Sequence, residues 1–496
     1  MAGIDELRRV RLDKKALLEE KGFSGYPATV KRTHSIFDLK NSFEDILNNQ
    51  PEDIISITGR VLSIRGQGAI LFVTLLDGNQ KFQVVFKKDE IDIDVFSLFV
   101  DVVDIGDFIS VSGKLFITKR GENSLLVNEW AMATKSLLPL PEKWHGLEDE
   151  EERNRKRYLE MITDNTVYDR MVMRSRITNA IRNFFNNLDF IEVETPILQN
   201  QAGGANAKTF DTHHNDYDMP MVLRIAVELD HKIIMASGIP RIYEIGKMFR
   251  NEGSDPSHIQ EFTMIEWYAA FQTLDDNMAW TEELLKHLAH DIALKDEYKI
   301  LDKDGNFQII NFSGNWLKKK FGDLLLEYAN IDFINISNDD LKIEAKKYGM
   351  AENEINTVSR ATMLDYIYKR TARPKLIDPT FVTHYPGELK PLAQQNEDGT
   401  AEVAQLIIAG MEITNQYAEL VDPTIQRKLM EQQSVNKAAG DDEAMEIDER
   451  FLTAMEHGMP PMTGFGMGID RIIAILTEQN NLRDTLYFPI MRPKSE

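Results

Sequence analysis

Residues 241–271 read RIYEIGKMFRNEGSDPSHIQEFTMIEWYAAF, and this stretch decides the fold of the larger part of the chain. Residues 241–250 and 261–268 both alternate in the manner of β-strands, and the turn residues of GSDP lie between them. Side chains of a strand point to alternate faces. One face of the second strand therefore combines an apolar edge with polar groups: Phe262, Met264, Glu266 and Tyr268. A surface hairpin with one wet face would fit this pattern, but a carboxylate among large side chains also predicts a polar site on a sheet.

The residues around the turn favour the second interpretation. FRNE at 249–252, followed by EFTM at 261–264, resembles motif 2 of the class II aminoacyl-tRNA synthetases. The continuation IEWY at 265–268 is most similar to the lysyl-tRNA synthetase version of that motif. The resemblance implies a catalytic Arg250 between the ATP α-phosphate and the amino-acid carboxylate. It also implies ATP contacts or lysine contacts for Glu252 (adenine), His258 (phosphate), Phe262 (stacking on adenine) and Tyr268 (the lysine ε-ammonium).

The composition sets the class of protein. A chain of 496 residues with 43% hydrophobic residues predicts a globular protein of two or three domains. No run of about 18 apolar residues occurs, so we expect no membrane span. The absence of Cys excludes disulfides, Cys-ligated zinc and a Cys nucleophile, and it suits a cytoplasmic protein. The net charge of −23 disfavours indiscriminate binding to nucleic acid but leaves room for a specific RNA.

After a helical lead-in over residues 1–50, residues 51–138 are rich in short β segments. Turn residues separate five of them, at 55–65, 69–76, 80–87, 108–118 and 124–133. With a helix at 91–100, this order predicts a five-stranded OB-fold β-barrel, whose usual ligand is single-stranded nucleic acid. Phe72, Phe82 and Phe86 are candidates for stacking on bases.

TGRVLSIR, LFVTLLDG and KFQVVF resemble the anticodon-binding domain of lysyl-tRNA synthetases. The resemblance implies that Arg65 (or Arg60), Phe72, Gln83 and Glu129 contact the anticodon of tRNA(Lys). Residues 139–157, with LPLP at 138–141 and KWHGL at 143–147, are expected to link this domain to a catalytic domain over 158–496.

The catalytic part begins with a predicted helix at 168–188 and a predicted strand at 190–198. The pair resembles motif 1 of class II synthetases, which implies a homodimer. The glycine-rich loop 199–210 lacks the phosphate-loop pattern, and by resemblance Gly204 (or Gly203) offers a carbonyl to the substrate ammonium group. Adjacent His213 and His214 point apart on a strand, so we expect no metal site there.

Three acidic residues are expected to form the amino-acid pocket. The resemblance places Glu228, Glu266 and Glu419 around the substrate. Free lysine has two ammonium groups, and a buried cation needs paired carboxylates, so this set favours lysine over aspartate or asparagine. In MEITNQYAEL at 411–420, Asn415 shares strand parity with Glu419, and the resemblance implies that Asn415 binds the substrate carboxylate.

The metal ligands depart from the family pattern. By resemblance Glu412 helps to hold Mg²⁺ and contacts ATP, but Gln405 stands where the family has a second acidic ligand. Glu412 also has the wrong strand parity, so a bulge or a different strand end must bring it to ATP. A second departure is Lys390, where the family usually has Ser, and Ser257 and Ile259 beside His258 are also atypical of the family.

TGFGMGIDR at 463–471 opens an apolar helix and is not the GxGxxG of dinucleotide folds. It resembles motif 3, which implies that Arg471 packs on adenine, pairs with the γ-phosphate and acts in catalysis. Residues 296–380 are expected to be an insertion, with helices near 317–328 and 339–348 and little recognisable chemistry.

We therefore predict an α+β protein: the OB-fold barrel, then a class II catalytic domain on an antiparallel β-sheet flanked by helices. The expected activity is lysine activation with ATP and Mg²⁺, followed by transfer to tRNA(Lys). Three alternatives remain: an aspartate or asparagine synthetase, a protein-lysylating paralogue, and a non-catalytic RNA-binding relative. The acidic pocket argues against the first, the barrel against the second, and Arg250 with Arg471 against the third.

Overall fold

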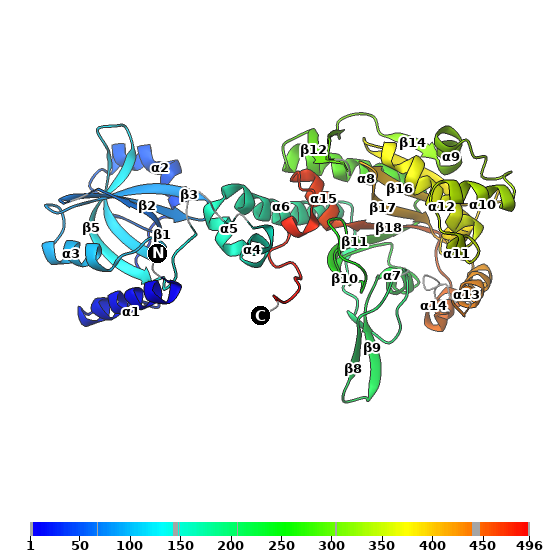
Figure 1. Ribbon diagram of the computed structural model, residues 1–496, viewed down its shortest axis with the longest axis horizontal. Coiled ribbons are helices and arrows are strands. Elements are labelled where there is room, and N and C mark those ends of the chain that lie inside the picture. The colour runs from blue at the N-terminus through cyan, green and yellow to red at the C-terminus, as the bar shows by residue number, and fades with distance from the viewer. Residues whose placement is uncertain are drawn as a thin grey trace. The chain divides into compact units, whose positions relative to one another are not determined.

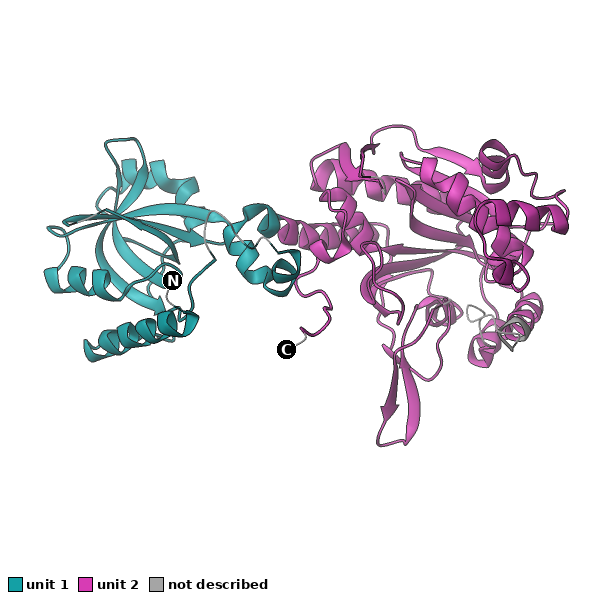
Figure 2. Cartoon of the chain, viewed as in Figure 1, with its two compact units in different colours: residues 1–169 teal, residues 170–496 magenta. Residues whose placement is uncertain are grey.

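The computed structural model describes residues 3–66, 68–141, 147, 149–205, 207–302, 305–438 and 447–494. The chain forms two compact units, Met1–Asp169 and Arg170–Glu496 (Figure 2). Across the described ranges, the helices are all too short or too polar to cross a membrane. The expected contents of 142–146, 148 and 439–446, which include most of KWHGL, lie outside the described residues.

The first unit contains a closed barrel in the strand order β1-β2-β3-β5-β4 (Figure 1). Its elements are α1 (Ile4–Glu20), α2 (Ile36–Asn49), β1 (Ile55–Arg65), β2 (Ile70–Asp77), β3 (Gln80–Lys87), α3 (Ile93–Val102), β4 (Phe108–Ile117) and β5 (Asn123–Thr134). Strand number, order and the helix between β3 and β4 confirm the predicted OB-fold. Alternate strand residues fill the barrel interior, including Phe82 and Phe86, which are 5% and 0% exposed. Both are therefore core residues, and Phe72 is the half-buried member of the predicted stacking set.

Three helices follow, at α4 (Glu150–Arg155), α5 (Arg157–Thr163) and α6 (Asn165–Asn187). Asp149 caps α4 by accepting a hydrogen bond from the backbone N–H of Glu151. Buried Arg157 pairs with Glu160 one turn later and donates to Asn154 Oδ1 at 2.6 Å. The segment predicted as a linker is therefore partly helical at its C-terminal end.

The second unit is built on an eight-stranded sheet in the order β14-β15-β16-β17-β18-β11-β10-β6. The strands are β6 (Ile191–Glu192), β10 (Arg241–Phe249), β11 (Glu261–Ala270), β14 (Leu317–Lys320), β15 (Thr380–Pro386), β16 (Thr400–Ile408), β17 (Met411–Ala418) and β18 (Met462–Gly468). Only the outermost pairs, β14 with β15 and β6 with β10, run parallel. The three sequence motifs expected to bind substrates thus become neighbouring central strands, although 191 residues (271–461) lie between β11 and β18.

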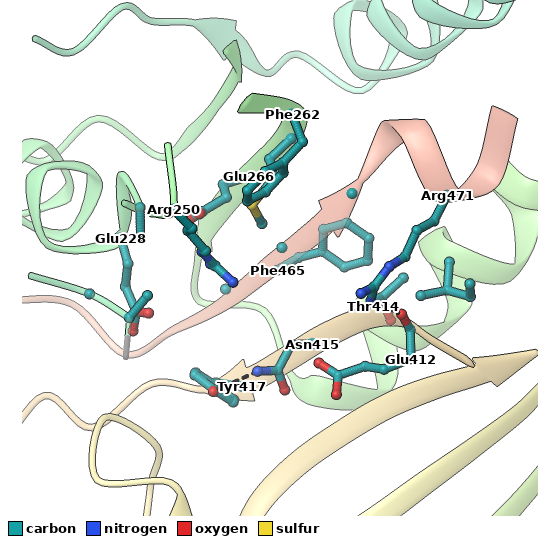
Figure 3. Close-up of a pocket in the computed structure, with 18 of the residues that line it drawn as sticks. Glu228, Arg250, Phe262, Glu266, Glu412, Thr414, Asn415, Tyr417, Phe465 and Arg471 are labelled. Atoms are coloured by element: carbon teal, nitrogen blue, oxygen red, sulfur yellow. Dashed lines mark hydrogen bonds between the residues drawn. The ribbon is translucent and has the colours of Figure 1, made fainter. Parts of the chain in front are cut away.

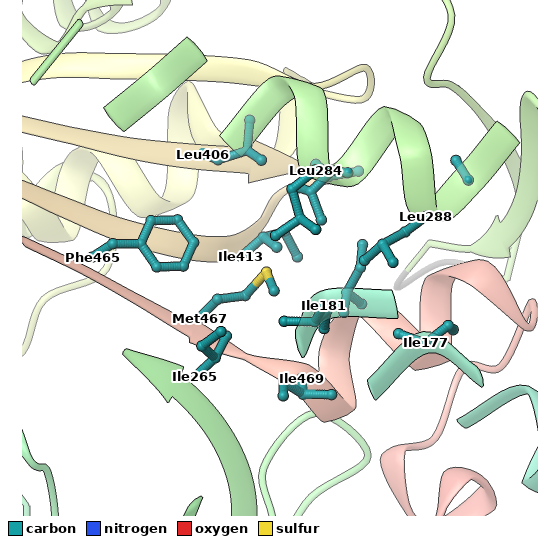
Figure 4. Packing of buried hydrophobic residues seen from close by; sticks show 14 of the residues in the cluster. Ile177, Ile181, Ile265, Leu284, Leu288, Leu406, Ile413, Phe465, Met467 and Ile469 are labelled. Carbon is teal, nitrogen blue, oxygen red and sulfur yellow. The ribbon is translucent and has the colours of Figure 1, made fainter. Parts of the chain in front are cut away.

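The predicted division of β11 into two faces is confirmed. Ile265, Trp267 and Ala269 pack into the main hydrophobic core with α6, α8 (Leu274–His287) and α15 (Ile469–Leu476). Figure 4 shows Ile177 and Ile181 of α6 meeting Ile265, Met467 and Ile469 in this core. The even-numbered residues of β11 face the opposite side of the sheet, where a cavity lies.

A second set of helices lies on the cavity side. Residues of α7 (Glu228–Met235), α13 (Pro423–Ala438) and α14 (Glu449–Glu456) share a hydrophobic cluster with Tyr268 and Ile242. A small sheet of β7 (Leu198–Gln199), β9 (Met219–Leu223) and β8 (Asp211–His214) precedes α7.

The region expected to be an insertion contains a two-stranded sheet and four helices. These are β12 (Glu297–Leu301), β13 (Phe307–Asn311), α9 (Phe321–Ala329), α10 (Asn338–Lys347), α11 (Glu352–Ile355) and α12 (Arg360–Thr371). Single turns occur at η1 (Leu288–Ile292), η2 (Arg373–Lys375), η3 (Gly387–Leu389) and η4 (Leu482–Thr485). The predicted helix at 317–328 is wrong over its first four residues, which form β14, because their backbone pairs with β15.

The strand pairing decides two further expectations, the strand at 190–198 and the facing of Glu412. The predicted strand at 190–198 is largely wrong: only Ile191–Glu192 and Leu198–Gln199 pair, and Pro196 lies in the unpaired stretch between them. The predicted bulge in β17 is confirmed. Leu406 pairs with Thr414 but Ile407 pairs with Glu412, so Ile413 is the extra residue that reverses the facing of Glu412.

Candidate active site

A cavity of about 370 Å³ lies on the face of β11, β18 and β17 opposite the main core (Figure 3). It brings together every residue that the sequence assigned to ATP or lysine: Gly204, Glu228, Arg250, Glu252, His258, Phe262, Glu266, Tyr268, Glu412, Asn415, Glu419 and Arg471. These residues come from five separate stretches of the chain: Gly204, Glu228, residues 250–268, residues 412–419 and Arg471. Gln405, the second expected metal ligand, does not line the cavity.

Glycines of the middle strand make room for the cavity. In the ladder, Gly466 pairs with Glu266 on one side and with Asn415 on the other, while Gly464 pairs with Tyr268 and Tyr417. A Cβ at Gly464 would clash with Glu419 Oε1 and would stand 2.5 Å from Cε1 of Tyr268. The backbone of β18 therefore forms the floor of the cavity, and the functional side chains extend into the cavity from β11 and β17 on either side.

Two arginines mark one end of the cavity. Arg250 follows β10, and its guanidinium lies 5.2 Å above the Phe262 ring and 3.4 Å from the carbonyl oxygen of Ile225. Burial lowers the pKa of Arg250, although nearby Glu252 and Glu266 oppose the shift. Arg471, in the first turn of α15, donates to the carbonyl oxygen of Glu412 at 2.7 Å. Two guanidinium groups at one end of a cavity suit a polyanionic ligand.

The loop between β10 and β11 brings His258 to the same end. Its Nδ1 lies 2.9 Å from Asp255 Oδ2 and 3.0 Å from Ser257 Oγ, and its Nε2 lies 3.4 Å from Arg471 Nη2. Asp255 therefore fixes the ring with Nε2 turned toward the cavity. Ser257, which is atypical of the family at this position, also helps to orient His258.

The acidic end holds a cation that the sequence analysis missed. Lys232, on α7 and 0% exposed, places its Nζ 2.8 Å from Glu228 Oε1 and 2.6 Å from Glu419 Oε2. Its spacing of four residues from Glu228 on a helix is a signal that could have revealed the first pair. The three acids therefore do not converge unpaired: with all of them ionised, the cluster Glu228, Glu266, Glu419 and Lys232 has a net charge of −2.

Burial perturbs these groups in different directions. Desolvation raises the pKa of Glu266 to about 8, and the neighbouring Glu228 adds to the shift. Desolvation also raises the pKa of Glu419, while Lys232 opposes that rise. Burial disfavours the charge on Lys232, but its two carboxylates outweigh it and raise the pKa of Lys232. Lys232 is therefore charged, whereas Glu266 is a buried carboxyl group that ionises readily only when a cation binds beside it.

Asn415 sits at the middle of the cavity, between the acidic and basic ends. Its Nδ2 donates to the Tyr417 hydroxyl at 2.8 Å (Figure 3). Its Oδ1 accepts from Gln405 Nε2 at 3.4 Å and from Lys390 Nζ at 3.5 Å. Gln405 is thus a buried support for Asn415 on the neighbouring strand β16.

The donor set does not fit an enzyme-held Mg²⁺ between positions 405 and 412. Mg²⁺ is bound through carboxylates and water oxygens, and Gln405 instead turns its amide nitrogen to Asn415. In the described parts of the chain, no three His, Cys, Asp or Glu side chains gather as a metal site. That includes His213 and His214, of which His213 contacts the exposed Asp218.

On the barrel, three of the four predicted anticodon residues are adjacent. Arg65 pairs with Phe72 across β1 and β2, and Gln83 pairs with Thr74, two residues from Phe72. Glu129 lies apart, because it follows the β5 partner of Gln83, Ser124, by five residues, or roughly 16 Å of strand. Glu129 instead pairs with Lys31 at 2.7 Å. Arg60, the alternative to Arg65, donates to the carbonyl oxygen of Gly106 and lies over the Phe108 ring.

Comparison with known proteins agrees with this architecture. Residues 149–492 match the family of class II tRNA synthetases for D, K and N, and residues 55–133 match the OB-fold nucleic acid binding domain. A lysine–tRNA ligase from Prochlorococcus marinus (strain MIT 9515) is 40% identical over 506 residues, covering 99% of this chain and 97% of that relative. The lysine–tRNA ligase of Synechococcus sp. (strain RCC307) is 38% identical over 495 residues, with the same coverage. The chain thus belongs to the class II aminoacyl-tRNA synthetases and, within them, to the lysine–tRNA ligase family.

Proposed function

We propose that this chain activates L-lysine with ATP to lysyl-adenylate and pyrophosphate, and then transfers lysine to the 3′ end of tRNA(Lys). The observation that supports it most directly is the charge of the cavity. Three carboxyl groups and Lys232 lie at one end, and the cationic side chains of Arg250 and Arg471 lie at the other. Lysine presents two ammonium groups and one carboxylate, and so matches this gradient in both charge and direction.

The acidic end accounts for the choice of lysine. Glu266 has no cationic partner within ion-pair distance among the described residues, and Tyr268 Oη lies 3.4 Å from its Oε2. An ammonium group that arrives beside Glu266 removes the cost of ionising this buried acid. Aspartate or asparagine would leave the acidic cluster without that compensation, and their side chains would call for a donor instead. We assign the ε-ammonium to Glu419, Glu228 and Tyr268, and the α-ammonium to Glu266 and the Gly204 carbonyl.

The basic end accounts for the chemistry. A carboxylate oxygen of lysine attacks the α-phosphorus of ATP, the bond to the bridging oxygen of the β-phosphate breaks, and pyrophosphate leaves. Two anions must approach each other in this step, and a fixed guanidinium such as Arg250 reduces their repulsion. Phe262 and Arg471 would hold the adenine between them, Glu252 would contact the adenine, and His258 would contact a phosphate. A ribose hydroxyl of tRNA then attacks the acyl carbon, and AMP departs.

Other parts of the proposal rest on the family relation. The barrel would bind the anticodon through Arg65, Phe72, Gln83 and Glu129. Mg²⁺ would enter as the counter-ion of ATP, two copies of the chain would form a homodimer, and the enzyme would act in the cytoplasm. These roles are part of the same proposal.

The test is ATP–pyrophosphate exchange with MgATP and each of the twenty amino acids in turn. We expect exchange with lysine and a preference of at least about 100-fold over every other amino acid. Exchange with aspartate or asparagine would overturn the charge argument. No exchange with any amino acid, from protein that still binds ATP, would favour a non-catalytic RNA-binding relative.

A further inference from the structure

Lys390 lines the cavity, whereas Lys232 lies buried behind its acidic end. Lys390 follows η3, and its backbone is held on both sides: its N–H donates to the Gly387 carbonyl at 2.9 Å, and its own carbonyl accepts from Gln395 Nε2 at 3.0 Å. In the described residues, no carboxylate lies within 4.0 Å of its ammonium group. A fixed cation that faces a cavity without an anion is prepared for an anionic ligand.

The surroundings of the ammonium group hold it without neutralising it. Lys390 Nζ lies 5.5 Å from the ring centre of Tyr385 and 5.6 Å from that of Tyr417. Its ammonium group makes a long hydrogen bond of 3.5 Å to Asn415 Oδ1. Two aromatic faces and an amide oxygen stabilise a cation while leaving its charge uncompensated. Burial lowers the pKa of Lys390, with Glu412 as the leading opposing influence.

The residue that Lys390 contacts also indicates which part of the cavity Lys390 serves. Asn415 lies between Tyr417 and Glu412, whereas Glu228 lies on the far side of Tyr417 from Glu412 (Figure 3). Glu412 belongs to the end where Arg471 binds its carbonyl oxygen, whereas Glu228 belongs to the Lys232 cluster. Lys390 therefore lies toward the end proposed for the phosphates of ATP.

The same region is where the donor set fails to fit a metal ion. Gln405 provides no charge and donates to Asn415, and the ammonium group of Lys390 is directed at the same oxygen. A dication beside Glu412 would lose one carboxylate ligand and meet a fixed positive charge. The two departures from the family pattern, at 390 and 405, thus shift the charge of this region in the same direction. Gln405 replaces an acid, and Lys390 adds a cation.

We propose that the Lys390 ammonium group binds a phosphate oxygen of ATP in place of a metal ion held by the protein at Glu412. Resting on the proposed function, this assigns Lys390 a share in neutralising the α-phosphate as the lysine carboxylate attacks. Metal would then enter only with ATP itself. The bonds made and broken are those of the activation step, and Lys390 stays protonated throughout.

Binding without metal is the first test. ATP affinity is measured by calorimetry in EDTA for the full chain, for Lys390→Met and for Lys390→Arg. We expect Lys390→Met to weaken binding at least 10-fold and Lys390→Arg to retain most of it. Lys369→Met, which removes a lysine paired with Asp365 outside the cavity, should bind as the parent does. Equal affinity of Lys390→Met and the parent, at an unchanged melting temperature, would overturn the proposal.

The second test counts metal ions. Mn²⁺ bound to the protein–ATP complex is measured by electron paramagnetic resonance. We expect one Mn²⁺ per ATP for the parent, and one more for the double variant Lys390→Ser/Gln405→Glu. A second Mn²⁺ in the parent would overturn the proposal. Neither test requires amino-acid activation, so a failure of the proposed function would show as absent exchange while both binding results stand.

Discussion

Lys232 Nζ lies 2.6 Å from Glu419 Oε2 and 2.8 Å from Glu228 Oε1, so a residue of α7 and the residue that follows β17 are joined through one buried ammonium group. The lysine is 0% exposed and the two acids are 4% and 9% exposed, which makes each group dependent on the others. This arrangement fixes two of the acids in place before a substrate arrives. It also sets the net charge that a lysine ligand then meets.

Lys232→Met should destabilise the fold by about 3–5 kcal/mol, because it leaves two buried carboxylates without their cation. Chemical denaturation of the full chain, followed at the unfolding transition of the second unit, measures the loss in free energy of unfolding. The surface variant Lys318→Met, which breaks an exposed pair with Asp275, should cost under about 1 kcal/mol. Equal stabilities of the two variants would show that the buried cluster is protonated and needs no cation.

Lysine binding should depend on pH through Glu266. Its pKa of about 8 in the free protein means that it is mostly protonated at pH 6.5, whereas the substrate ammonium favours the carboxylate. Affinity should therefore rise by up to about tenfold per pH unit below pH 8, and level off above it. Calorimetry in two buffers of different ionisation enthalpy should detect the release of about one proton. Proton release that persists in Glu266→Gln would assign the effect to another group.

The same group should make the free protein less stable as pH rises. The folded pKa lies above the unfolded value near 4.5, so the folded state binds more protons between pH 4.5 and 8 and loses stability across that window. Glu266→Gln should remove this slope and raise the melting temperature at pH 8.5 by several degrees. A parallel pH profile for the variant and the parent would contradict the assignment.

Gly464→Ala should disrupt the lysine site by steric clash, without changing any charge. The new methyl group would clash with Glu419 and the Tyr268 ring, so these side chains must move. We expect the KM for lysine in pyrophosphate exchange to rise about 100-fold, with a smaller change for ATP. Gly314→Ala is the matched control, since no atom lies within 4 Å of its Cβ position. A normal KM for lysine would mean that the floor of the cavity is not where lysine binds.

The sequence was sufficient for the elements whose signals are local. Alternation along residues 261–268 predicted both faces of β11. The parity of Glu412 required either a bulge or a different strand end, and the structure has the bulge, at Ile413. Contacts between distant segments were not predictable in this way. The pairing of Lys232 with Glu419 joins residues 187 positions apart, and β14 is a strand only because β15 pairs with it. The exposure of Phe72 and the burial of Phe82 likewise depend on barrel closure, which no single strand determines.

Phe72→Ala should separate recognition of tRNA from amino-acid activation. The ring is half-buried on the barrel surface opposite Arg65, where a base could stack on it. Stacking of one base is worth about 1–3 kcal/mol, so the KM for tRNA in aminoacylation should rise about 5- to 150-fold. Pyrophosphate exchange should be unchanged, because it takes place without tRNA. Ile117→Ala, at an exposed position on β4, controls for loss of an apolar surface group. Equal losses in the two variants would move the anticodon site away from the Arg65–Phe72–Gln83 face and toward the separate position of Glu129.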